Sequence, residues 1–121
     1  MMWWGKYIGL PYEQAHCWEL VRRVYAERLG VQLPGYGEVD ARDLVRVARE
    51  IDRGQDRWQP VDVPAEYDGV LMRGRRGVWH VGVMTDASHV LHTERATSAV
   101  RVPLDHLSIK GRIAGFRRYV L

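Results

Sequence analysis

One cysteine and a few histidines are the residues of this chain with the clearest capacity for chemistry. Cys17 is the only cysteine among the 121 residues, and it opens a segment in which apolar residues recur every three or four positions. This spacing predicts a helix over residues 16–29, ended by Gly30. A thiol in the first turn of a helix faces unpaired backbone N–H groups and the positive end of the helix dipole. Both favour the thiolate, so the pattern predicts a reactive nucleophile of low pKa.

Two histidines in the second half of the chain are candidates for the base that such a nucleophile needs. His80 lies in a strand predicted over residues 78–84, and His92 in one predicted over residues 89–93. Their separation is even, and with a three-residue turn at 86–88 an even separation places both side chains on one face of an antiparallel hairpin. His92 then stands opposite Gly82 and diagonal to His80. A thiol, a base and an orienting group form the arrangement that nucleophilic amide hydrolysis uses.

The remaining periodicity predicts a single α+β domain over residues 1–121. A second helix is expected over residues 40–54, from an N-cap at Asp40 to Gly54. The pattern then becomes strand-like, with a weak extended piece at 58–63 that Pro60 interrupts. Strands follow at 67–72, 78–84, 89–93, 100–102 and 113–120. Helices followed by an antiparallel meander predict N-terminal helices packed on a C-terminal antiparallel sheet of about five strands.

Composition narrows the class of protein. The chain is 46% hydrophobic and 27% charged, as globular domains are, and a single cysteine excludes an internal disulfide. No run approaches the roughly 20 apolar residues of a membrane span, and the first residues lack a signal-peptide pattern. We therefore expect a protein made in the cytoplasm with no membrane partner. The formal charge of +3 is scattered except near residues 73–77, so nucleic-acid binding rests on charge alone and is a weak hypothesis.

The same residues also have plain structural interpretations. Cys17 is in register with the core positions of its helix, which is typical of a buried and inert cysteine. His80 and His92 are equally consistent with strand histidines bonded to the backbone. A metal site formed by Cys17, His80, His89 and His92 is disfavoured, because His89 points to the opposite strand face from His92. The chain also lacks Cys-x-x-Cys and His-Glu-x-x-His spacings, so we expect no metal.

Two motifs in a fixed order carry a resemblance to a known family. The first motif surrounds the cysteine and reads Pro11-Tyr12 … Cys17-Trp18-Glu19-Leu20-Val21-Arg22-Arg23-Val24-Tyr25 … Leu29-Gly30-Val31-Gln32-Leu33-Pro34. The second motif is His80-Val81-Gly82 followed by His92-Thr93, with Tyr67-Asp68-Gly69-Val70 before it. Together they resemble the NlpC-type papain-like cell-wall peptidases, most closely the branch encoded by phages and prophages near tail genes. The resemblance covers roughly residues 4–93.

This resemblance implies a papain-like fold and a role for each matched residue. Cys17 would be the nucleophile, His80 the general base, His92 the group that orients it, and Tyr12 a substrate-binding residue. The family hydrolyses amide bonds in peptidoglycan stem peptides, of the γ-D-glutamyl–diaminopimelate type, without a cofactor. The implied partners are a peptidoglycan peptide and other phage tail proteins, which would place the protein in a virion.

Two positions depart from the family pattern and support a second hypothesis. His16 stands where the family has an aspartate, which removes a favourable N-cap, and Glu19 stands where it has a glycine. A carboxylate at position 19 opposes a thiolate two residues away. The alternative is a catalytically weak or inactive papain-like fold that acts as a phage tail assembly or structural protein.

Overall fold

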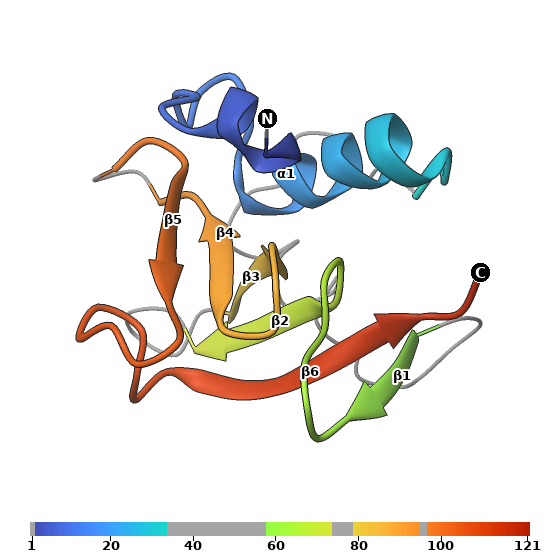
Figure 1. Ribbon diagram of the computed structural model, residues 1–121. Coiled ribbons are helices and arrows are strands. Elements are labelled where there is room, and N and C mark those ends of the chain that lie inside the picture. The colour runs from blue at the N-terminus through green and yellow to red at the C-terminus, as the bar shows by residue number, and fades with distance from the viewer. Residues whose placement is uncertain (1, 34–57, 74–78, 95–96) are drawn as a thin grey trace.

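A computed structural model describes residues 2–33, 58–73, 79–94 and 97–121 (Figure 1). The second predicted helix, at residues 40–54, lies outside these described residues, and so does most of the arginine-rich segment at 73–77. The described part is an α+β arrangement of one α-helix, two short helical segments and one antiparallel sheet. None of its helices is long and apolar enough to cross a membrane.

The helix that begins with Cys17 forms close to where the sequence predicts it. A short 3-10 segment, η1 (Trp3–Tyr7), precedes it, and α1 spans Cys17–Val24. The chain then widens into one π-helical stretch, η2 (Tyr25–Leu29). Gly30 ends it in the left-handed conformation, with φ of 67°, which glycine adopts without the steric penalty of a Cβ atom. The predicted C-terminal cap is therefore confirmed.

Within the described residues the sheet contains six strands, where the sequence predicts about five. In chain order they are β1 (Trp58–Val61), β2 (Gly69–Arg73), β3 (Trp79–Met84), β4 (His89–His92), β5 (Val100–Pro103) and β6 (Ile113–Tyr119). Their spatial order is β1-β6-β2-β3-β4-β5, with every described pair antiparallel. The additional strand is β1, where Pro60 pairs with Arg117. A proline has no N–H to donate, but β1 lies at the edge of the sheet, where the missing donor is tolerated.

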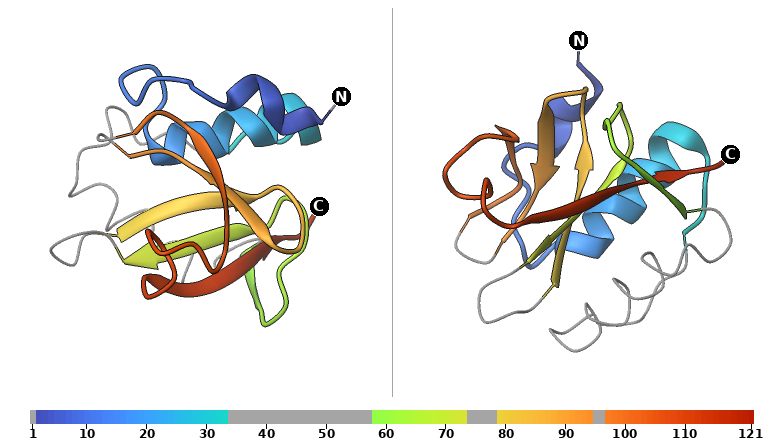
Figure 2. Two further views of the ribbon diagram at one scale, coloured as in Figure 1. Left: turned by 60° about the vertical axis from the view of Figure 1, so that its left-hand side comes forward. Right: turned by 90° about the horizontal axis from the view of Figure 1, so that it is seen from below.

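Apolar side chains are buried on both faces of the sheet. The helices lie together along one side of the strands (Figure 2). On this side, α1 contributes its buried residues to a cluster that includes Leu71, Val81, Val83 and Leu91. A second cluster on the other side contains Val70, Met72, Met84, Val90 and Ile109. Burial of such side chains stabilises the fold by roughly 1.5–3 kcal/mol each.

A tyrosine fixes the far end of the helical region against the sheet. Tyr25 is buried, and its hydroxyl donates a hydrogen bond to the carbonyl oxygen of Tyr67, just before β2. The Tyr25 ring also packs against Trp58 of β1 and Tyr119 of β6. These contacts fix α1 along the sheet and so determine where its N-terminal residue, Cys17, lies.

Candidate functional site

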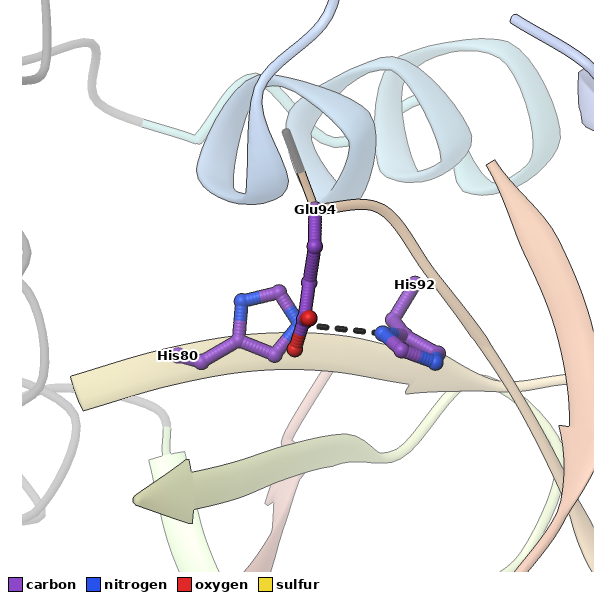
Figure 3. Close-up of side chains that lie close together, drawn as sticks. All are labelled: His80, His92 and Glu94. Carbon is purple, nitrogen blue, oxygen red and sulfur yellow. Dashed lines mark hydrogen bonds and ion pairs between the residues drawn. The ribbon is translucent and has the colours of Figure 1, made fainter. Parts of the chain in front are cut away.

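The two histidines of the second predicted motif meet in the structure. His80 Nε2 and His92 Nδ1 are 3.0 Å apart and form a hydrogen bond, and both residues are buried (Figure 3). The hairpin between them has the expected three-residue turn at 86–88. The Thr85 N–H closes this turn by donating a hydrogen bond to the carbonyl oxygen of His89. The register Met84↔Val90 then aligns β3 with β4 so that both imidazoles share one face. The predicted pairing of His80 with His92 is confirmed.

Gly82 makes this pairing possible. A Cβ atom at position 82 would lie 2.8 Å from Val90 Cγ2, 3.0 Å from the Leu91 carbonyl oxygen and 3.2 Å from His92 Cβ. All three separations are shorter than ordinary van der Waals contact. The absence of a side chain at Gly82 therefore lets β4 approach β3 closely enough for the two rings to meet.

Glu94 and Arg112 complete this cluster, and sequence analysis missed both. Glu94 Oε1 lies 3.8 Å from His80 Nε2 and accepts a hydrogen bond of 2.6 Å from Arg112 Nη2. Glu94 follows His92 at an even spacing, a signal that could have drawn attention to it. Arg112 lies in the turn before β6 and reaches the site only through the fold, so no local pattern points to it.

The residues that flank Cys17 are accommodated in the helix start. His16 is the N-cap of α1, and its Nδ1 accepts a hydrogen bond of 3.3 Å from the Glu19 backbone N–H. Histidine thus takes over the capping function that an aspartate side chain would have. The Glu19 carboxylate accepts a hydrogen bond of 2.7 Å from Arg22, one turn along the helix. This ion pair reduces the repulsion that the Glu19 carboxylate would exert on a thiolate at Cys17.

Cys17 itself is deeply buried, and this overturns the expectation of a low pKa. The residue is only 2% exposed, and its thiol is free. Burial disfavours the charged thiolate and raises the pKa of Cys17 to about 11, even though the backbone amides of Val81, Trp18 and Cys17 favour the anion. The helix terminus acts in the predicted direction, but desolvation is the larger effect.

We therefore expect slow alkylation of Cys17 in the free protein. At about pH 7.5, a thiol with a pKa near 11 has at least about 100-fold less thiolate than an exposed thiol of pKa about 8.5. The rate of reaction with iodoacetamide, followed by mass spectrometry and compared with that of glutathione, measures this difference. A rate for Cys17 that equals the glutathione rate would contradict the buried, neutral thiol.

The described residues include no hydrogen bond between Cys17 Sγ and His80. Cys17 belongs to the cluster that also contains Val81 and Val83 of β3, whereas His80 pairs with Met72 and so lies on the opposite strand face. The influence of the Val81 amide on Sγ nevertheless places the thiol against the β3 backbone next to His80. The structure thus brings His80 and His92 into contact and leaves Cys17 as their neighbour across β3.

Burial also keeps the two imidazoles uncharged. Desolvation and the neighbouring His92 lower the pKa of His80 to about 3, and desolvation lowers the pKa of His92 as well. Burial raises the pKa of Glu94, but the hydrogen bond from Arg112 and the electrostatic effects of Arg112 and the two histidines together outweigh it, so the pKa of Glu94 is also lowered. At neutral pH the cluster therefore contains two neutral histidines and one carboxylate that is paired with a guanidinium.

The same three side chains could supply ligands to a metal ion, but their contacts favour a different use. Ligand atoms of His80, His92 and Glu94 all lie within 4.8 Å of one another. In the structure the two imidazoles bond to each other, and Glu94 bonds to Arg112. A divalent cation would have to break the first contact and lie beside the positive charge of Arg112. His89, the other member of the set weighed from sequence, bonds to Asp86 in the turn instead.

Tyr12, the expected substrate-binding residue, is half-buried in the turn that precedes α1. In the sequence, Tyr12 lies five residues before Cys17, the first residue of α1.

Comparisons with known proteins do not place the chain in a family. No family model matches it, and no match was found among curated proteins.

Proposed function

We propose that this protein is a papain-like cysteine peptidase that hydrolyses amide bonds in peptidoglycan stem peptides, of the γ-D-glutamyl–diaminopimelate type, in association with a phage or prophage tail. The observation that carries the proposal is the hydrogen-bonded pair His80–His92, next to a helix whose first residue is the only cysteine. The substrate class and the tail association rest on the sequence resemblance around Cys17 and His80.

The chemistry assigns one role to each of these residues. No hydrogen bond joins Cys17 Sγ to His80 among the described residues, so the proposed reaction requires the two side chains to come within hydrogen-bond distance when substrate binds. Cys17 Sγ then attacks the amide carbonyl carbon while its proton moves to His80. The backbone N–H groups at the start of α1 stabilise the oxyanion that forms. The C–N bond then breaks, the leaving amine takes the proton from His80, and water hydrolyses the thioester with His80 as base. His92 orients the His80 ring throughout, and the reaction needs no cofactor.

The protonation states of the free protein constrain this mechanism. Burial favours the neutral forms of both Cys17 and His80, so a separated thiolate and imidazolium are not the resting state. Proton transfer to His80 must therefore accompany the formation of the S–C bond. Substrate binding next to the thiol would also have to open a route to Sγ, since Cys17 is 2% exposed.

Release of free amino groups from purified peptidoglycan tests the proposal. We expect release by the wild type and none by Cys17→Ala. The His92→Ala variant should have a lower kcat with little change in KM, because His92 orients the base and does not touch substrate. Circular dichroism of each variant controls for folding. Equal release by wild type and Cys17→Ala would reject the cysteine as the nucleophile.

The burial of Cys17 favours a second candidate function. A thiol that is buried and neutral is also what an inactive papain-like fold would keep as a core residue, and such a protein could serve in phage tail assembly. The same assay separates the two candidates. A folded wild-type protein that releases no amines from peptidoglycans of several stem-peptide types would favour the assembly protein.

A further inference from the structure

Glu94 is held in place by a residue that is itself fixed from several sides. Arg112 donates to the carbonyl oxygen of Arg73 at 2.7 Å, to that of Ser108 at 3.1 Å and to Glu94 Oε1 at 2.6 Å. The side chain of Arg112 is 23% exposed and that of Glu94 is 28% exposed, so both are partly withdrawn from water. The position of the Glu94 carboxylate beside His80 is therefore determined by the fold.

The hydrogen bond between the two histidines can form with its proton in either of two places. In the first arrangement His80 Nε2–H donates to His92 Nδ1, so His80 Nδ1 is free to accept a proton. In the second arrangement His92 Nδ1–H donates to His80 Nε2, so the proton of neutral His80 is on Nδ1. Only the first arrangement gives His80 a ring nitrogen that can act as a base.

Considered alone, the histidine pair favours the unproductive arrangement. His92 Nε2 is buried and has no hydrogen-bond partner among the described residues. The first arrangement places a proton on this nitrogen and so creates a buried N–H without an acceptor. Buried N–H groups of this kind are rare because they lose their hydrogen bonds to water without replacement.

We propose that Glu94, anchored by Arg112, is a positioning residue that keeps the proton of His80 on Nε2 and leaves Nδ1 as the base. A carboxylate 3.8 Å from Nε2 attracts the positive end of an N–H dipole and repels a nitrogen lone pair, and this interaction favours the first arrangement. The role of His80 Nδ1 as a base rests on the proposed function. The position of the proton on the His80 ring does not depend on that function.

The position of the proton can be measured directly by NMR with ¹⁵N-labelled histidine. Long-range ¹H–¹⁵N spectra distinguish a protonated ring nitrogen from an unprotonated one. We expect Nε2 of His80 to be the protonated nitrogen in the wild type at neutral pH. In Glu94→Gln, a neutral isostere, we expect a substantial share of the proton to move to Nδ1. Glu94→Asp, which retains the charge, should preserve most of the wild-type pattern.

The matched control is Glu66→Gln, the same substitution at an exposed glutamate that bonds to Trp3. It should leave the His80 signals unchanged. A wild-type proton on Nδ1, or identical His80 signals in wild type and Glu94→Gln, would overturn the proposal.

Kinetics give a second measurement if the wild type is active. Glu94→Gln should then lower kcat by about tenfold or more, because the base is correctly protonated in fewer molecules, and should leave KM within about twofold. If the NMR result is as expected but no peptidoglycan is hydrolysed, the positioning role of Glu94 stands and the proposed peptidase function fails.

Discussion

Lowering the pH from about 7.5 to 5.5 should remove about 1–3 kcal/mol from the free energy of unfolding, through His80 and His92. Both are buried, and burial lowers the pKa of each below its ordinary value, to about 3 for His80. Near pH 5.5 the unfolded chain binds a proton at each of these histidines, whereas folded His80 binds almost none and folded His92 binds less than it does in the unfolded chain. The unfolded state therefore gains protons first, and stability falls as the pH falls below about 6.5.

Urea denaturation at three pH values in this range measures the effect. The matched variant is His80→Gln/His92→Gln, which should have a much smaller pH dependence whatever its absolute stability. A residual dependence is expected from His16, whose pKa burial also lowers and whose Nδ1 caps α1 only while unprotonated. A wild-type midpoint that stays constant or rises towards pH 5.5 would be inconsistent with two buried, neutral histidines.

Replacing Gly82 by alanine should destabilise the protein by about 1–3 kcal/mol and separate the two histidines. The added Cβ would lie 3.0 Å from the carbonyl oxygen of Leu91, which is backbone and cannot rotate away. Strand β4 would have to shift from β3, and His92, whose Cβ lies 3.2 Å from the new atom, would move with it. The hydrogen bond between His80 and His92 would lengthen or break.

Thermal unfolding and the histidine NMR signals test the two parts of this prediction. The control is Gly5→Ala, because no atom lies within 4 Å of a Cβ there and alanine favours the helical conformation of η1. Gly5→Ala should be neutral or slightly stabilising. If Gly82→Ala has wild-type stability and unchanged His80 signals, the close approach of the strands does not position the pair.

The parts of the fold that depend on local pattern could be predicted from the amino-acid sequence. The helix from Cys17 to its glycine cap follows from apolar spacing and from the freedom of Gly30 to adopt a positive φ. The pairing of His80 with His92 follows from strand alternation and a three-residue turn. Strand β1 was undercounted because Pro60 weakens a strand pattern unless the strand is known to lie at an edge.

The rest of the site depends on contacts between segments that are distant in sequence. The expectation of a low pKa for Cys17 was wrong. A helix terminus can be recognised from the local sequence, whereas the burial of the Cys17 sulfur depends on how α1 packs against β3. Glu94 lies beyond the end of a strand, where alternation no longer fixes the direction of a side chain. Arg112 reaches Glu94 from a turn whose position is set by β6.

The place of β6 in the sheet also determines the order in which the molecule can be assembled during synthesis. Strand β6 (Ile113–Tyr119) comes after the other described strands in the sequence, yet it lies between β1 and β2, with Trp58 opposite Tyr119 and Gly69 opposite Arg117. While the nascent chain lacks β6, β2 has an open edge and β1 has no partner among the other described strands. The β2–β3–β4–β5 segment that carries the histidines can form earlier, since its strands pair in sequential order. Completion of the described sheet, and with it the placement of Arg112, therefore has to wait until β6 has emerged from the ribosome.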